Sequence, residues 1–182
     1  MKHDLVEALR NRKSSRAIDP RPVEQEKIEA LIEAFRWGPS SGNRQPWRLV
    51  FAESAEARAG WDAALDPANQ LWAPRAPVKI TVIGNPNEQE ALHDQQRFLL
   101  DCGLALHALL VQACAMGLNV RAMAGWDESK VRSALRIEDP YRVVALVAAG
   151  YPCALEDLPP QVQQKEQRPR ARKSRNEIVS RR

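Results

Sequence analysis

A short basic segment near the N-terminus combines side chains that can hold an anion. From Arg10 to Arg16 the sequence RNRKSSR places four cations and two hydroxyls in seven residues. Guanidinium and ammonium groups form charge-assisted hydrogen bonds to a phosphate or to an anionic ring. The same composition also fits a solvated turn that follows a helix, so by itself it leaves both interpretations open.

Two further polar segments could contact a ligand. The loop PSSGNRQPW, residues 39–47, places small hydroxyls and amides beside a glycine, which allows the backbone to approach a flat ligand closely. It also fits a plain connection between a helix and a strand. Near the other end, Lys173-Ser174-Arg175 could bind phosphate or simply keep the terminus soluble.

The nucleophilic and metal-binding side chains form no motif. The chain has three cysteines and three histidines: Cys102, Cys114, Cys153, His3, His93 and His107. None has the spacing of a CxxC or HExxH site, so we expect no metal. Cys102, His107 and Cys114 share an apolar helical stretch, where buried thiols are more common than nucleophiles. Without GxGxxG or a P-loop, side chains and helix ends must hold any phosphate.

These candidate residues must be positioned by helices with clear apolar stripes. Between Pro22 and Trp37, apolar residues recur at helical spacing, and Gly38-Pro39 ends the pattern. A longer stripe from Glu88 to Met116 predicts a central helix near Leu106, and a further helix is expected over 127–135.

Strands are predicted at residues 48–52, 78–83 and 143–149, the last apolar enough to be buried on both faces. Residues 119–123 form a short segment of unassigned type. From Pro152 onward the sequence has prolines and no strong periodicity, which predicts an extended arm over about 153–182. The predicted fold class is α+β, with a small mixed or antiparallel sheet packed around the central helix.

The composition fits one globular domain spanning residues 1–182. Apolar residues make up 44% and charged residues 27%, and no run approaches the roughly 20 apolar residues of a membrane span. The charged N-terminus lacks an apolar signal region, so a cytoplasmic location is expected. The net charge is +4, yet residues 165–182 hold eight Lys/Arg and two Asp/Glu. Such a tail could contact nucleic acid, a membrane surface or solvent.

Taken together and in this order, the polar segments resemble the nitroreductase family. The resemblance lies in Arg12-Lys13-Ser14-Ser15-Arg16, the 39–47 loop, Ala124-Gly125-Trp126 and Lys173-Ser174-Arg175. It implies FMN as cofactor, with NAD(P)H as electron donor. It also implies a homodimer in which the C-terminal arm reaches the partner and both subunits build each site.

The resemblance also implies roles for individual residues. The FMN phosphate would lie against Arg12, Ser14, Lys173 and Arg175. Lys13 and Arg16 would face the phosphate or the pyrimidine edge of the flavin ring, where the charge of Arg16 would stabilise the reduced flavin. Asn69 would bond the pyrimidine edge.

The reactive atom, flavin N5, would face a backbone N–H from Met123, Ala124 or Gly125. The partner subunit would contribute Pro39, Ser40, Ser41 and Asn43 to the ribityl chain and ring. The sequence departs from the family pattern at Ala122, where many members have proline, and at Trp72, where lysine is common. The 84–97 stretch is also too short for the helices that cover the pocket in larger members.

The reaction implied is ping-pong transfer from NAD(P)H through the flavin to a nitroaromatic, quinone or enone acceptor. Related flavin reactions remain open: reductive dehalogenation, flavin fragmentation and azoline oxidation. An alternative from another class is a nucleic-acid-binding protein that uses residues 165–182. We do not expect nucleic acid as a partner, because the tail has no aromatic side chains to stack on bases.

Overall fold

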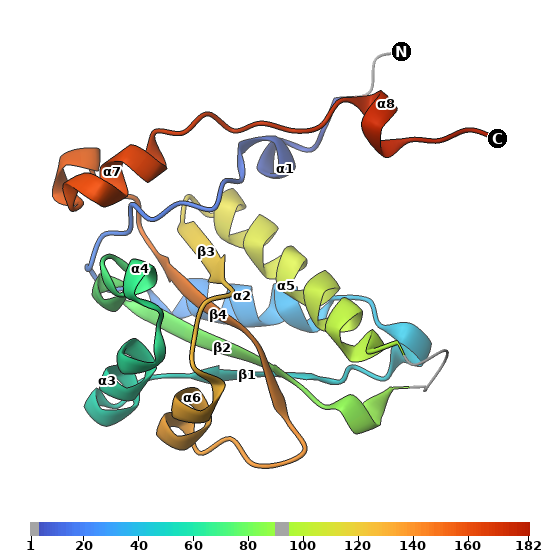
Figure 1. The fold of residues 1–182 in the computed structure, drawn as a ribbon, viewed down its shortest axis with the longest axis horizontal. Helices are drawn as coiled ribbons and strands as arrows, with labels where there is room; N and C mark the ends of the chain where they lie inside the picture. Colours follow the sequence, from blue (N-terminus) through green and yellow to red (C-terminus); the bar gives the residue numbers. More distant parts are fainter. Residues whose placement is uncertain (1–3, 90–94) are drawn as a thin grey trace.

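A four-stranded antiparallel sheet lies between two layers of helices in the computed structural model, which describes residues 4–89 and 95–182 (Figure 1). His3 and His93 therefore lie outside the described residues. The strands are β1 (Trp47–Phe51), β2 (Val78–Gly84), β3 (Asn119–Met123) and β4 (Arg142–Gly150), in the order β1-β2-β4-β3. The α+β prediction is confirmed, and the sheet is antiparallel throughout.

The prediction of only three strands was wrong, because residues 119–123 form β3 at one edge of the sheet. β3 pairs with the end of β4 over its whole length, from Asn119 opposite Gly150 to Met123 opposite Leu146. Its apolar residues are interrupted by polar Asn119 and Arg121, which contact the N-terminal segment instead of the core. Five residues with this pattern give too weak a period-2 signal to identify a strand.

One face of the sheet is covered by α2 (Gln25–Arg36) and α5 (Arg97–Ala115) (Figure 1). The predicted stripe of the first helix is confirmed, since Leu31 and Phe35 are buried in this layer. α5 packs on the alternate residues of the two central strands, including Ile80 and Val147. Both faces of β4 are buried along most of its length, as the apolar 143–149 run predicts.

The long helix begins at Arg97 and not at Glu88. Residues 86–88 form a 3-10 turn, and the backbone N–H of Phe98 donates to the side chain of Gln89, which lies outside the helix. Residues 90–94 of the predicted helix lie outside the described residues.

By length and composition alone, α5 is apolar enough to cross a membrane, as the core helices of globular proteins can be. The expectation that no segment of the chain approaches the length of a membrane span was therefore wrong.

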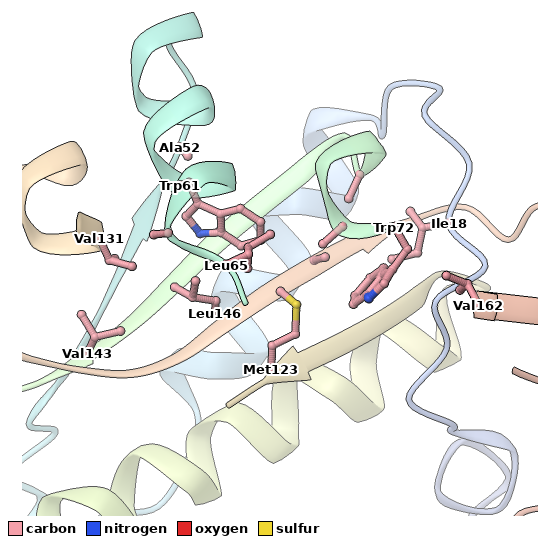
Figure 2. Close-up of a cluster of buried hydrophobic side chains, with 14 of the residues drawn as sticks. Ile18, Ala52, Trp61, Leu65, Trp72, Met123, Val131, Val143, Leu146 and Val162 are labelled. Atoms are coloured by element: carbon pink, nitrogen blue, oxygen red, sulfur yellow. The ribbon is translucent and has the colours of Figure 1, made fainter. Parts of the chain in front are cut away.

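The other face of the sheet carries α3 (Ala55–Ala64), the short α4 (Pro67–Gln70) and α6 (Glu128–Leu135). Figure 2 shows the core of this layer, in which Trp61 and Val131 pack near Leu146 of β4. Trp72 and Ile18 extend the same cluster toward the N-terminal segment (Figure 2).

The chain ends lie together along one side of the molecule. The N-terminal α1 (Glu7–Asn11) runs beside the C-terminal tail, which leads from α7 (Pro160–Glu166) to α8 (Arg175–Ile178) (Figure 1). Arg170 of the tail donates to the backbone carbonyls of Leu9 and Arg10. Further 3-10 turns span Ser41–Asn43, Ala73–Arg75 and Leu155–Asp157.

The expected extended arm over 153–182 was therefore only partly right. Residues 155–166 fold back onto their own chain, with Leu158 and Val162 buried in the core. The first residue of α7 after its N-cap is Pro160, and proline is favoured in the first turn of a helix because its missing N–H needs no partner there. Only the chain beyond Gln167 is extended, apart from the exposed α8.

Candidate anion and cofactor site

Three parts of the chain meet at one strongly basic pocket of about 280 Å³. They are the segment after α1, strand β3 and the end of α7 with the tail. We use the name basic pocket for the site lined by Arg12, Lys13, Ser14, Arg16, Arg121, Lys165, Glu166, Arg168, Arg170 and Arg172. Eight cations thus converge with a single carboxylate.

The N-terminal segment is fixed to the edge of the sheet. Ser14 forms a parallel bridge with Val120, and the guanidinium of Arg121 donates to the carbonyl of Ser14 at 2.6 Å. The side chain of Arg12 lies within 3.5 Å of the Ser14 hydroxyl, to which it donates. The predicted residues Arg12, Lys13, Ser14 and Arg16 therefore line one pocket.

The eight cations that line the basic pocket are only partly neutralised, because its lining includes a single carboxylate, that of Glu166. Burial lowers the pKa of Arg12 below its ordinary value, and repulsion from Arg170 and Arg172 lowers it further. Burial likewise lowers the pKa of Arg121, assisted by the charge of Arg16. The Nε atom of Arg121 is buried and has no hydrogen-bond partner among the residues that the structure describes. Because buried donors are normally paired, this set of groups fits a bound anion.

Glu166, the one carboxylate of the basic pocket, contacts the N-terminal segment at several atoms. Its Oε1 accepts from the Ser15 hydroxyl at 2.6 Å and lies 3.3 Å from Lys13 Nζ. Its Oε2 accepts from the backbone N–H of Arg16 at 2.9 Å. Burial opposes ionisation of this carboxyl, but the bonds from Ser15 and Arg16 and the charge of Lys13 outweigh it and lower the pKa of Glu166.

A chain of contacts leads from the basic pocket to the loop after β3. The Arg121 guanidinium lies 5.9 Å from the centre of the Trp72 ring, and Trp72 Nε1 donates to Asn69 Oδ1 at 3.2 Å. The backbone N–H of Asn69 donates to Asp66 Oδ1 at 2.7 Å. The backbone N–H of Asp66 in turn donates to the carbonyl of Gly125 at 3.2 Å. Asn69 is thereby held between Arg121 and Gly125.

A side chain at position 125 would force the Asp66 carboxylate to move. A Cβ atom there would lie 1.9 Å from Asp66 Oδ2. Ala124 and Gly125, which directly follow strand β3, both line a second pocket. Outside the strand ladder, no described residue accepts a hydrogen bond from the backbone N–H of either residue. Both donors can therefore face a ligand.

The 39–47 loop lies at the far end of α5. The backbone N–H of Ser41 donates to Asp101 Oδ1 at 3.2 Å, and a Cβ atom at Gly38 would lie 2.4 Å from Ala105 Cα. Arg12, by contrast, lies near Cys114, close to the opposite end of the same helix. Asp101 and Cys114 are separated by 13 positions in α5, or about 20 Å at a rise of about 1.5 Å per residue. Within one chain, this loop therefore lies far from the basic pocket.

The loop has an unusual backbone. Asn43 and Gln45 have φ values of 53° and 50°, in the left-handed region that residues other than glycine rarely adopt. The Ser40 hydroxyl holds the turn by accepting from the backbone N–H of Gln45 at 3.0 Å. Pro39 and Asn43 are exposed, and Ser40 and Ser41 are half-buried. Such strained and exposed loops often carry binding residues.

Different tail residues from the predicted ones line the basic pocket. Lys173 and Arg175 are exposed and are not among its lining residues. The pocket is lined instead by Arg168, Arg170 and Arg172, which were not predicted as site residues. Arg121, Lys165 and Glu166 were missed as well, since each is a single charged residue without a motif. Only the pairing of β3 and the return of α7 bring them to the site.

None of the three cysteines lines the basic pocket, although Cys114 lies near Arg12. Cys102 is fully buried, and burial, together with the nearby Asp101, raises its pKa to about 12. His107 is exposed on α5. Within residues 4–89 and 95–182, no group of three or more His, Cys, Asp or Glu side chains could hold a metal ion.

Comparison with known proteins identifies the family. The model of the nitroreductase family matches residues 9–79 and 60–151, which together span well over half of the chain. The chain belongs to the nitroreductase family. A nitroreductase relative from Xanthomonas oryzae pv. oryzae, provisionally named NADH dehydrogenase/NAD(P)H nitroreductase, is 30% identical over 165 residues, covering 81% of this chain and 84% of its own.

Solved structures with the same fold include an FMN-containing oxidoreductase and a nitroreductase family protein. A structure described as an oxidoreductase containing FMN matches with a TM-score of 0.79 and 28% identity, covering 91% of this chain and 86% of its own. A nitroreductase family protein from Clostridium novyi NT matches with a TM-score of 0.74 and 25% identity, over 80% and 85% of the two chains.

Proposed function

We propose that this protein is an FMN-dependent oxidoreductase that uses NAD(P)H as electron donor. The observation that carries the proposal is the position of two features on either side of β3. The basic pocket lies on one side, where the buried Nε of Arg121 has no partner among the described residues. The Ala124-Gly125 loop follows the other end of the strand. A flavin mononucleotide has a phosphate at one end and a redox-active ring at the other. The relative of known structure that is described as containing FMN supports the same cofactor.

The residues present fit the two ends of FMN. Arg12, Arg170 and Arg172 repel one another and would be neutralised by a phosphate. Asn69 uses its side-chain oxygen on Trp72, which leaves its amide N–H groups for the carbonyl oxygens of a pyrimidine edge. Gly125 keeps the loop close to Asp66, with backbone donors free for the ring. Lys173 and Arg175 stay further candidates for the phosphate.

The protein's own contribution to the reaction is position and charge. When bound, FMN supplies transfer of two electrons from NAD(P)H to a nitroaromatic, quinone or enone acceptor, in ping-pong order. Lys13 and Arg16 provide fixed positive charge where negative charge develops on the pyrimidine edge. The N–H groups of Ala124 and Gly125 provide donors beside the reacting edge of the ring.

We further propose that the site is shared in a homodimer. Leu99, Leu100 and Leu104 are 41%, 64% and 40% exposed along one side of α5, an apolar surface that a second copy would cover. Two α5 helices packed antiparallel about a twofold axis would bring the 39–43 loop of the partner subunit to the basic pocket. The exposed Ile178 and Val179 of the tail fit an arm that reaches the partner.

The experiment that tests the cofactor compares FMN with riboflavin, which lacks the phosphate. Apoprotein titrated with each flavin should bind FMN far more tightly, and the substitution Arg12→Ala should remove most of that difference. Purified protein that carries flavin should release FMN and not FAD on denaturation. Equal affinity for FMN and riboflavin would contradict the assignment of the basic pocket to the phosphate.

A further inference from the structure

We propose that Glu166 is a positioning residue for FMN, because its carboxylate fixes both walls of the basic pocket. This inference rests on the proposed function in taking FMN as the anion. It predicts an unexpected direction for the change in FMN affinity when this carboxylate is removed. Removing this negative charge from an anion-binding pocket should weaken FMN binding instead of strengthening it.

The carboxylate is held by groups that cannot easily move. The side chain of Glu166 is only 7% exposed. Its Oε1 accepts from the hydroxyl of Ser15, which is fully buried, at 2.6 Å. Its Oε2 accepts from a backbone N–H, that of Arg16, at 2.9 Å. A carboxylate that receives a backbone donor and a buried hydroxyl on separate oxygens fixes the path of the main chain through residues 15 and 16.

Ser15 extends this contact to the edge of the sheet. Its Oγ accepts from the backbone N–H of Ala17 at 3.1 Å and from the side-chain amide of Asn119 at 3.0 Å. Asn119 also donates to the carbonyl of Ala17 at 2.6 Å. Asn119 is the first residue of β3, the strand that carries Arg121 into the basic pocket. Glu166 thus links α7 through Ser15 to β3.

The same residue fixes the start of the tail. Glu166 is the last residue of α7, and the chain runs directly from it to Arg168, Arg170 and Arg172. On the other side of the pocket, the Glu166 carboxylate lies 3.3 Å from Lys13 Nζ and 3.9 Å from the guanidinium of Arg16. One carboxylate therefore sets the separation between the two basic walls that would enclose a phosphate.

A simple charge argument gives the opposite expectation. A carboxylate among eight cations repels a phosphate, so its removal should tighten FMN binding if the surrounding residues kept their places. The substitution Glu166→Gln separates these views because the amide keeps the shape of the side chain. Its one oxygen can accept from Ser15 or from the Arg16 N–H, while its NH₂ group faces the other donor.

The test measures FMN binding to the apoprotein by quenching of flavin fluorescence. We expect Glu166→Gln to raise the Kd for FMN by about tenfold or more, the effect of losing a charge-assisted hydrogen bond. The matched control is Glu156→Gln, which removes the same charge from an exposed residue of the same C-terminal region. Its Kd should equal that of the wild type. Unchanged or tighter FMN binding by Glu166→Gln would overturn the proposal.

Ser15→Ala is the second variant, and it decides the matter if Glu166→Gln fails to fold. It removes the hydroxyl while keeping the carboxylate charge, so positioning predicts weaker FMN binding and the charge argument predicts no change. At saturating FMN, both variants should also alter the visible circular dichroism of the bound flavin, because Lys13 and Arg16 shift against the ring. An unaltered spectrum and Kd for Ser15→Ala would contradict the positioning role.

The role of Glu166 can be tested separately from the proposed function. Inorganic phosphate is titrated against the same apoproteins, and Glu166→Gln should bind it more weakly than the wild type. If the wild type bound no FMN, the proposed function would fail, and the phosphate titration alone would test the role of Glu166. Equal phosphate affinity in the two proteins would then contradict it.

Discussion

The buried indole of Trp72 donates through Nε1 to the side-chain oxygen of Asn69 at 3.2 Å. Trp72 is 1% exposed and packs in the core beneath the Asn69 turn. This bond orients the Asn69 amide, so that its oxygen faces Trp72 and its NH₂ group is directed away from the indole, where it can donate to a ligand. The family resemblance leads one to expect lysine at position 72. The tryptophan found there orients the side chain of Asn69.

Trp72→Phe should weaken FMN binding about twofold to tenfold, the range for losing one neutral hydrogen bond. The smaller phenyl ring leaves part of the buried indole site empty, so the free energy of unfolding should also fall, by about 2 kcal/mol. Trp61→Phe is the matched control, since buried Trp61 Nε1 donates to Thr81 at 3.2 Å, away from Asn69. It should lose similar stability and keep its FMN affinity. Equal loss of affinity in both variants would contradict the role of Trp72.

Two pairs of tail substitutions distinguish the residues that line the basic pocket from the residues suggested by the family resemblance. Arg170→Ala/Arg172→Ala should sharply reduce FMN affinity, because both guanidiniums act on Arg12 in the pocket. Lys173→Ala/Arg175→Ala should have the smaller effect, since neither residue lines it. Flavin titration of both apoproteins measures the difference. A larger loss in the second pair would show that the tail is placed differently when FMN is bound.

The Glu128 carboxylate should make stability depend on pH in acid. Its hydrogen bonds from Arg142, at 2.8 and 3.0 Å, lower its pKa, and the backbone N–H of Val143 assists while burial opposes. Because the folded pKa lies below the ordinary 4.5, the stabilisation is present above that pH and is lost as pH falls through the folded pKa.

Urea unfolding of wild type and Glu128→Gln checks this pH dependence. At pH 7 the wild type should be more stable by up to about 1 kcal/mol, as for other partly exposed ion pairs. The difference should shrink once the pH falls below the folded pKa. A difference that stays constant from neutral pH to acid would mean that Glu128 acts by packing and not by charge.

The shared site can be tested by mixing two damaged subunits. One protein carries Arg12→Ala/Ser14→Ala and the other Ser40→Ala/Asn43→Ala, and the two are refolded together. About half of the dimers are then mixed, each with one intact site of two, so activity should return to roughly a quarter of wild type. If both segments acted within one chain, every site would keep a lesion. Mixing would then restore nothing.

Local patterns were enough to predict much of the fold. The apolar run over 143–149 identified a strand buried on both faces, and the stripe through Leu31 and Phe35 identified α2. These signals lie within single elements. β3 was missed because Asn119 and Arg121 face the N-terminal segment, and α7 was missed because prolines and glutamines surround its buried Val162.

The candidate site was only partly predictable for the same reason. The cations of 12–16 are dense in sequence, but by themselves they fitted a solvated turn as well as an anion site, and the resemblance to the nitroreductase family favoured the anion site. Arg121 and Glu166 are isolated charges whose importance comes from contacts with residues more than 100 positions away. The separation of the 39–47 loop from the basic pocket also depends on how α5 packs, because the two lie near opposite ends of this helix, and no local pattern contains that packing.

The most direct test of the account is anaerobic stopped-flow reduction of the FMN-saturated protein by NADH and NADPH. The visible flavin band should bleach with at least one donor and return when a quinone or nitroaromatic is added after the donor is consumed. Arg16→Ala, also saturated with FMN, should bleach about a hundredfold or more slowly, because it lacks the charge beside the pyrimidine edge. Bound FMN that neither donor reduces would contradict the proposed activity, and an unchanged rate in Arg16→Ala would remove the role assigned to that residue.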